Sequence, residues 1–380
     1  MQPETPSANM LDRRRFFELA GLSTVALAAS SAAIAAAPTS GAMPLANLSL
    51  NENPWGPSAA AKQAMLDHLT RVNRYASPET RHLAEAIAAQ ERVSPDMVVI
   101  GTGSSPILRT LGDYFATQMP GGELITAPAT FEVQYKAVEA RGGKVVHVPF
   151  DDQLRYDVDA MLSKVSANTC GIYICNPNNP TGTVVPTDKM RGFVREAAKK
   201  TWVFVDEAYI DMTDDYPHSS MIDLVRAGQN VIVCRTFSKM HGLAAARCGY
   251  AIMPAALAGK VRGTLSSGGL PRLAIVAATA SLADTANLAA MKVRLKRGRE
   301  KLIAMADALG ATYAPNSAAN FIYLKTNMPT RDFVAKMKAR NILVVQRGFP
   351  QYDQWNRICV GFDEEIAQCH SALKDVLKTA

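Results

Sequence analysis

The sequence predicts an α/β fold in which a mostly parallel sheet is covered by helices on both faces, followed by a smaller α+β unit. Between about residues 97 and 253, short apolar runs alternate with helical segments, which is typical of parallel strands joined by crossover helices. Polar residues stand at the ends of several of these runs, where open α/β sheets bind their ligands. After Leu273 the alternation gives way to a long helical region.

Each element of the main sheet follows from its local pattern. Seven apolar runs are expected to be its strands, at 97–100, 123–126, 144–148, 171–175, 202–205, 231–234 and 249–253. Helices are expected at 58–69 (with Ser58 as N-cap), 78–91, 107–117 and 131–140. The Pro- and Gly-broken stretch 51–57 cannot be regular helix.

The C-terminal unit is expected to contain a long helical region at 274–309. Strands at 320–324, 342–345 and 358–360 then alternate with helices at 331–340 and 364–378. The predicted organisation is therefore a signal peptide at 1–42, an N-terminal arm at 43–75, a large domain at 76–273 and a small domain at 274–380.

The first residues have the layout of an export signal. Arg13, Arg14 and Arg15 precede Phe16, and an uncharged run rich in Ala, Ser and Leu follows to about Ala37. The arginine pair resembles the twin-arginine signal, which implies a periplasmic protein. A membrane anchor is the alternative, although Ala and Ser make this run weakly hydrophobic for a span. The cleavage site, within 35–42, stays open.

Composition indicates a globular protein with no nucleic-acid partner. Of the 380 residues, 48% are hydrophobic and 20% charged, and the net charge of +7 is not clustered into a basic stripe. The six cysteines show no CxxC spacing typical of metal sites, so no metal is expected. Most lie in or beside predicted core strands, so we expect buried free thiols.

Several polar residues follow predicted strands, and each has a plain structural alternative. Ser104 and Ser105, before a helix, can bind an anion or merely cap the helix. Asp206 can serve a ligand or cap a helix, and Asn176 can be turn chemistry. Lys239 and Arg247 can hold a charged ligand from two sides, or be solvated.

The order of these motifs resembles fold-type I pyridoxal-phosphate (PLP) enzymes, and specifically the class I/II aminotransferases of the histidinol-phosphate aminotransferase branch. The resemblance extends from about Leu48 to the C-terminus. Its motifs are NENPWGP at 51–57, NPNNPTG at 176–182, VDEAY at 205–209, TFSKMHGLAAARCG at 236–249 and RICVGFDEE at 357–365. The resemblance implies an aspartate aminotransferase-like fold, a homodimer with shared active sites, and transfer of an amino group from a small amino donor to a 2-oxo acid.

The resemblance also implies roles for individual residues. Lys239 would form the Schiff base with PLP and move protons, and Asp206 would keep the pyridine nitrogen protonated. Asn176 and Tyr209 would bind the phenolate oxygen, and Phe131 would stack on the ring or, alternatively, pack in the core. The residues expected to hold the phosphate are Ser104, Ser105, Ser238, Arg247 and the partner subunit's Tyr75.

Substrate binding is expected at Arg357, Arg347 and Asn53. An arginine fork suits a carboxylate or a phosphate, and Arg347 is alternatively a solvated loop residue. Two segments depart from the family pattern. Gly103-Ser104-Ser105-Pro106 replaces the usual Gly-Ser-Asp-Glu, and SSGGLPRLA at 266–274 replaces an aromatic and Asn-containing segment.

These departures, together with the export signal, leave the substrate open. Histidine biosynthesis is cytoplasmic, so a donor other than histidinol phosphate is expected. Two further functions stay open: a PLP-dependent decarboxylase like the threonine-phosphate decarboxylases, and a catalytically silent binding module of the same fold.

Overall fold

The computed structural model describes residues 45–265, 269–345 and 348–378. The predicted signal at 1–42 therefore lies outside the described residues, as does Arg347. Residues from Leu45 onward form one contact unit. Among the described helices, none is long and apolar enough by itself to cross a membrane; α10 (Arg272–Ala283) and α11 (Thr285–Ala308) pass that test only as a pair bent by 86°.

The large sheet contains the seven predicted strands. In spatial order they are β2 (Val98–Gly101), β8 (Gly249–Ile252), β7 (Val231–Thr236), β6 (Val203–Asp206), β5 (Thr169–Cys175), β3 (Glu123–Thr126) and β4 (Lys144–His147). Strand β8 runs antiparallel to both of its neighbours, and the other pairs are parallel. The predicted mostly parallel α/β sheet is confirmed.

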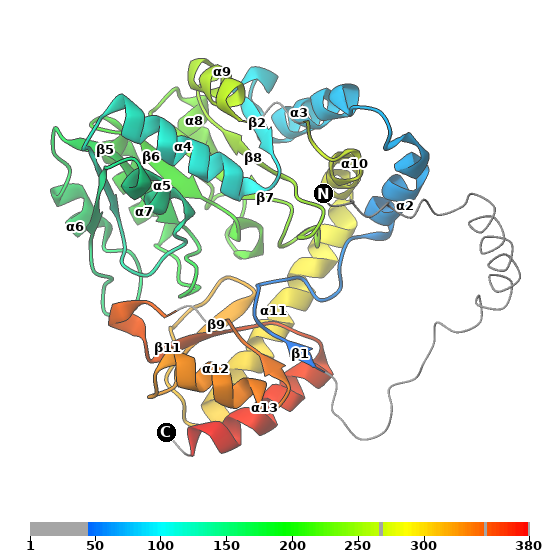
Figure 1. Ribbon diagram of the computed structural model, residues 1–380, viewed down its shortest axis with the longest axis vertical. Coiled ribbons are helices and arrows are strands. Elements are labelled where there is room, and N and C mark those ends of the chain that lie inside the picture. The colour runs from blue at the N-terminus through cyan, green and yellow to red at the C-terminus, as the bar shows by residue number, and fades with distance from the viewer. Residues whose placement is uncertain (1–44, 266–268, 346–347, 379–380) are drawn as a thin grey trace, which may run out of the picture. The chain divides into compact units, whose positions relative to one another are not determined.

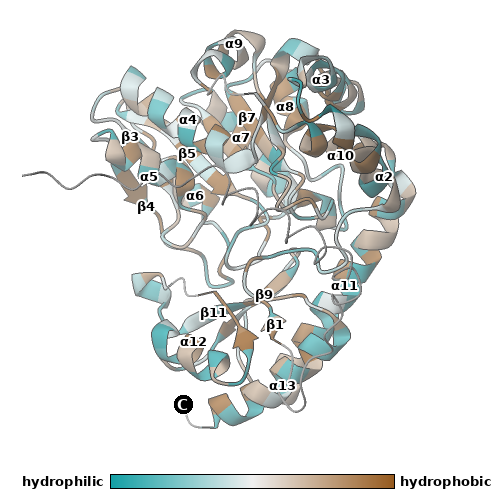
Figure 2. Ribbon diagram, turned by 45° about the vertical axis from the view of Figure 1, so that its right-hand side comes forward, coloured by the Kyte–Doolittle hydropathy of each residue, from teal (hydrophilic) through white to brown (hydrophobic). Residues whose placement is uncertain are grey.

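Helices cover both faces of this sheet. One face packs against α4 (Ser104–Gln118), α5 (Val133–Ala140) and α9 (Ala255–Thr264). The other packs against α3 (Ser77–Glu91), α6 (Val158–Ser163), α7 (Thr187–Ala198), α8 (Ile222–Arg226) and α10. Side chains alternate between these faces: Phe204 belongs to the first core, and Val203 and Val205 to the second. Figure 2 shows apolar colour concentrated in the strands and in α10.

The C-terminal part forms two small sheets. Strand β9 (Phe321–Lys325) pairs antiparallel with β11 (Trp355–Cys359), and β1 (Ala46–Asn47) pairs with β10 (Ile342–Leu343). Helices α12 (Thr330–Lys338) and α13 (Asp363–Leu377) complete this part. Figure 1 shows the long helix α11 running from α10 down to these small sheets. The arm thus reaches the C-terminal elements through β1.

Local signals set several element boundaries. Helix α2 (Ala59–His68) begins after Ser58, whose hydroxyl accepts a hydrogen bond from the Ala61 N–H at 3.1 Å, as an N-cap should. The predicted helical region 274–309 consists of two helices, because Asp284 ends α10 and caps α11 by accepting from the Asn287 N–H. All six cysteines are free and buried, as expected.

Candidate active site

One cavity of about 390 Å³ lies where the carboxyl ends of the central strands meet the N-terminal arm and β11. Parallel strands place the residues that follow them at one edge of the sheet, so segments distant in sequence converge there. Nine of the residues predicted for the site line this cavity: Ser104, Ser105, Phe131, Asp206, Tyr209, Ser238, Lys239, Arg247 and Arg357. The arm contributes Leu50, Asn51 and Glu52.

Lys239 lies in the tight turn that follows β7. The Ser238 N–H donates to Thr236 Oγ1 at 3.1 Å, and the Gly242 N–H donates to the Lys239 carbonyl at 3.1 Å, so both sides of the turn are fixed. Lys239 Nζ donates to the Leu50 carbonyl at 2.9 Å. Burial, reinforced by the nearby charge of Arg357, lowers the pKa of Lys239 to about 8. About a tenth of its amine is therefore unprotonated and nucleophilic at pH 7, far more than for an ordinary lysine.

Asp206 is the last residue of β6 and is buried. Its Oδ2 accepts from the Tyr173 hydroxyl at 3.0 Å, and its Oδ1 accepts from the Ala208 N–H at 3.2 Å. Burial raises the pKa of Asp206 to about 6. In the described chain it makes no ion pair, so a cationic or N–H group of a ligand would relieve the cost of burying its charge. No α-helix starts directly after it, so it is not a helix N-cap.

A cradle for an anion forms at the start of α4. Ser104 and Ser105 begin this helix, whose free N–H groups and dipole favour a negative ligand. The Arg247 guanidinium covers Gly103 and donates to the carbonyls of Ala244 (2.8 Å) and Thr102 (3.3 Å). Both acceptors are neutral. No carboxylate of the described residues pairs with Arg247, which suits it to a phosphate.

Arg357 supplies a second buried cation from β11. Its Nη2 donates to the Ser49 carbonyl at 2.6 Å, and its Nη1 donates to the Asn179 side-chain oxygen. Its Nε is buried without a hydrogen-bond partner, and the guanidinium carbon lies 5.4 Å from the centre of the Phe321 ring. Within the described ranges it forms no ion pair with a carboxylate. A buried guanidinium with only neutral partners favours an anionic group of a ligand.

Two predicted asparagines lie outside this cavity lining. Asn176 uses its side-chain oxygen to accept the Val185 N–H at 3.0 Å, which ties together the two ends of its loop. Asn179, three residues later in the same motif, lines the cavity. The order of residues within NPNNPTG gave no signal for choosing between these two asparagines, because a turn can direct either side chain inward.

In the N-terminal arm, too, a neighbouring asparagine lines the cavity in place of the predicted one. Asn53 donates to the Met240 carbonyl at 3.1 Å and accepts from the Trp55 N–H at 3.1 Å, which engages both ends of its amide. Asn51 lines the cavity and donates to the Tyr209 hydroxyl at 2.7 Å. Asn51 has a positive φ of 53°, so the two asparagines do not share one direction as they would in an extended strand, and the sequence pattern alone did not distinguish them.

Tyr75 does not line the Lys239 cavity. Its side chain is 82% exposed and borders a separate hollow of about 760 Å³, together with Gly269 and Leu270. Arg347 and residues 266–268 lie outside the described residues. Among the residues that the structure describes, no group of three or more His, Cys, Asp or Glu side chains could hold a metal ion.

Taken together, the cavity suits a ligand with three features. Lys239 can attack an electrophilic carbonyl, Asp206 can pair with a protonated ring nitrogen, and the Ser104–Arg247 cradle can bind a phosphate. Arg357 then remains for a second anion. PLP has all three features, so the side chains present fit this cofactor.

Comparison with known proteins agrees with this chemistry. The family model described as aminotransferase class I and II matches residues 44–373. A histidinol-phosphate aminotransferase from Moorella thermoacetica is 32% identical over 333 residues, covering 87% of this chain and 85% of that protein. An aromatic amino acid aminotransferase from Thermobifida fusca is 35% identical over 79% of this chain and 82% of that one. The solved structure of histidinol-phosphate aminotransferase from Sinorhizobium meliloti with pyridoxal-5'-phosphate has a TM-score of 0.79 and 27% identity, covering 88% and 91% of the two chains.

Proposed function

Since this chain belongs to the class I and II aminotransferase family, we propose that it is a transaminase for donors that carry an anionic group, which Arg357 binds. It resembles histidinol-phosphate aminotransferases and uses PLP. One observation supports a donor with an anionic group. Arg247 and Arg357 both line the Lys239 cavity, yet neither has a carboxylate partner among the described residues. One arginine suits the cofactor phosphate, and the other is then left for the substrate.

When bound, PLP supplies an electrophilic carbonyl and a ring that withdraws electrons from the substrate Cα. Lys239 would bind that carbonyl through its unprotonated amine, and the same amine would accept and return a proton at the substrate Cα. Asp206 would pair with the protonated ring nitrogen. Ser104, Ser105, Ser238 and Arg247 would hold the phosphate, and Phe131 would contact the ring.

Tyr209 and Asn179 would orient the ring oxygen of the cofactor. Burial raises the pKa of Tyr209 above its usual value, so its hydroxyl keeps a proton to donate. Asn51 donates to the same hydroxyl oxygen and thereby fixes its orientation. Asn179 holds Arg357, so it joins the cofactor and substrate parts of the cavity. In this assignment Asn179 takes the role expected from the sequence for Asn176.

A screen of amino donors against 2-oxo acid acceptors tests this proposal. The purified enzyme with PLP is expected to form amino-acid product fastest with donors that carry a carboxylate or phosphate. Arg357→Lys should raise KM for those donors by about 10- to 100-fold, the scale of one charge-assisted hydrogen-bond pair. Release of CO₂ without amino transfer would instead indicate a decarboxylase. Absence of any turnover with PLP bound would indicate a binding module.

A homodimer is part of the same proposal. Four large apolar side chains, Leu66, Leu69, Val72 and Tyr75, are exposed at three-residue spacing, and Tyr75 borders the 760 Å³ hollow. Such a patch is typical of a protein interface. A second copy covering it would bring Tyr75 toward the partner's cofactor phosphate.

We also propose that residues 1–42 direct export to the periplasm. Fusion of these residues to a reporter should place it there, and replacing Arg13 and Arg14 by Lys should retain it in the cytoplasm. Export that persists after this replacement would contradict the twin-arginine assignment, and a reporter that stays membrane-bound would favour the anchor.

A further inference from the structure

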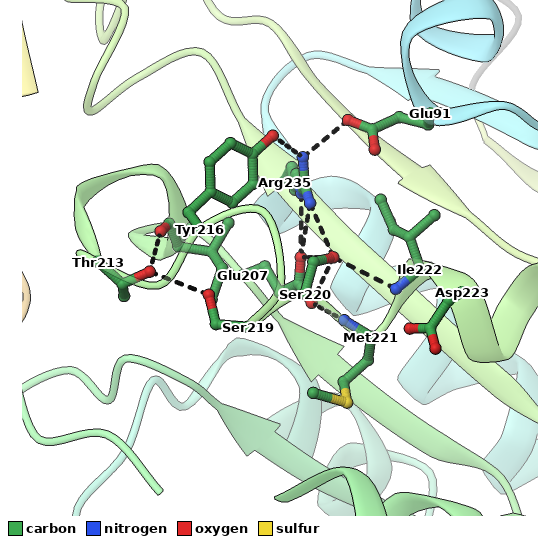
Figure 3. Close-up of polar contacts among 12 residues, drawn as sticks. Glu91, Glu207, Thr213, Tyr216, Ser219, Ser220, Met221, Ile222, Asp223 and Arg235 are labelled. Atoms are coloured by element: carbon green, nitrogen blue, oxygen red, sulfur yellow. Dashed lines mark hydrogen bonds and ion pairs between the residues drawn. The ribbon is translucent and has the colours of Figure 1, made fainter. Parts of the chain in front are cut away.

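A buried polar cluster surrounds Arg235, and Figure 3 shows its contacts. At its centre, Arg235 of β7 donates through Nε to Glu207 Oε2 at 3.0 Å and through Nη1 to Glu91 Oε1 at 2.8 Å. It also donates to the hydroxyls of Ser220 (2.9 Å) and Tyr216 (3.1 Å). All three guanidinium nitrogens of Arg235 therefore donate hydrogen bonds.

The charges of this cluster are well shielded from water. The side chains of Arg235 and Glu207 are 3% and 1% exposed, and that of Glu91 is 10% exposed. Glu207 accepts further hydrogen bonds from the Met221 N–H at 2.7 Å and the Ser220 hydroxyl at 2.9 Å. A buried ion pair often adds little to the stability of a protein, because apolar side chains of similar volume in its place can give an equally stable fold. The other reason to keep such a pair is that it holds neighbouring segments in one defined geometry.

The pairing register of β6 and β7 relates this cluster to the active site. Asp206 of β6 is paired with Cys234 of β7, and the next residues along the chain are Glu207 and Arg235. Successive side chains of a strand point to opposite faces. Asp206 thus faces the cavity, while Glu207 and Arg235 meet on the other side of the sheet. The Glu207 N–H also donates to the Cys234 carbonyl at 2.8 Å.

We propose that Arg235 and Glu207 are positioning residues that lock the carboxyl ends of β6 and β7, so that Asp206 and Lys239 converge on one cofactor. The inference rests on the function proposed above for these two residues. From Arg235 the path to Lys239 is short and rigid, since Thr236 ends β7 and its hydroxyl accepts the Ser238 N–H. Glu91, in α3, and the 213–221 loop hold the cluster from outside.

The test separates positioning from stability by measuring both in the same variants. Arg235→Met strands the carboxylates of Glu207 and Glu91 and should lower both Tm and PLP affinity. Adding Glu207→Gln and Glu91→Gln to Arg235→Met removes all three charges yet keeps an acceptor for the Met221 N–H. This triple variant should regain most of the lost Tm. Its affinity for PLP and its kcat should still be reduced, by roughly tenfold or more, as expected when reacting groups shift by a fraction of an ångström.

Leu373→Ala provides the matched control, because it truncates a fully buried side chain of α13 that does not line the cavity. It should lower Tm and leave PLP affinity unchanged. Apoprotein Tm by calorimetry and PLP binding by visible absorbance are the readouts. A triple variant that binds PLP with wild-type affinity would overturn the positioning role. If Arg235→Met does not fold, the single variant Glu207→Gln provides the test. Wild-type PLP affinity and kcat in Glu207→Gln would then overturn the positioning role. Wild-type protein that fails to bind PLP would instead refute the proposed function.

Discussion

The guanidinium of Arg247 packs directly over Gly103, the residue before α4, and both residues have positive φ angles of 67° and 92°. A Cβ at position 103 would lie well inside van der Waals contact distance of Arg247 Nη2. An arginine in the left-handed region is uncommon and needs surrounding contacts to hold it there. Here the Ala244 and Thr102 carbonyls hold the side chain over the start of α4.

Gly103→Ala should weaken binding of the cofactor phosphate by displacing Arg247. The new methyl group also strains a backbone conformation that only glycine adopts readily. Loss of one charge-assisted hydrogen bond predicts a PLP Kd raised by roughly 10- to 100-fold, measured by absorbance titration. Gly192→Ala is the control, since its Cβ would meet no atom within 4 Å in α7. Equal Kd values for the two variants would contradict the cradle.

Asp206→Asn should change how stability depends on pH in the apoprotein. The folded-state pKa of Asp206, about 6, lies above its ordinary value of 3.8. Its protonated form therefore stabilises the fold at low pH, and that contribution is lost as the pH rises through about 6. The amide that replaces the carboxyl group does not titrate, so the variant does not lose this stability as the pH rises. Between pH 4 and 7 the unfolding free energy of the variant, relative to that of the wild type, should therefore increase by up to about 3 kcal/mol. Urea unfolding at several pH values measures this difference, and parallel curves would contradict it.

The rate at which the apoprotein binds PLP covalently should rise with pH, with a midpoint near 8, because only the neutral Lys239 amine attacks. Arg357→Gln removes a neighbouring positive charge and should move this midpoint upward. Stopped-flow absorbance measures both profiles. Arg195→Gln, at an exposed position on α7, serves as control. A midpoint that stays constant in Arg357→Gln would contradict the electrostatic coupling of Arg357 with Lys239.

Shared active sites predict complementation between two defective variants. In a hybrid of Lys239→Ala and Tyr75→Ala subunits, one site receives both intact residues if Tyr75 acts on its partner. That site should bind PLP and turn over as in the wild type, while the two parent homodimers should not. Hybrids in which no site regains wild-type affinity would contradict a role for Tyr75 across the interface.

The sheet was predictable because its strands are apolar runs separated by helical segments. All seven strands fall at the expected positions, within about two residues. The break at Asp284 was missed, since Ala- and Leu-rich sequence continues on both sides of it and only the cap marks a new helix. The packing of β1 against β10 depends on a contact between distant segments, which local patterns do not report.

The site was predictable wherever a strand end determines the direction of a side chain. Asp206 ends β6 and Lys239 lies in the turn just after β7, and both line the cavity. The asparagines of the two loops were not distinguishable in this way. Asn179 and Asn51 line the cavity while Asn176 and Asn53 bond to backbone groups, because loop geometry depends on hydrogen bonds made after folding. The Arg235 cluster gave no signal, since its members are separated by up to 144 positions.

Reduction of the PLP-loaded protein with borohydride, followed by peptide mass mapping, tests the central claim most directly. Lys239 is the lysine that lines the cavity beside Asp206 and Arg247. The account predicts that the peptide containing Lys239 gains the mass of the reduced cofactor, and that Lys239→Ala abolishes both the label and the visible absorbance. A label on a different lysine, or undiminished absorbance in Lys239→Ala, would contradict it.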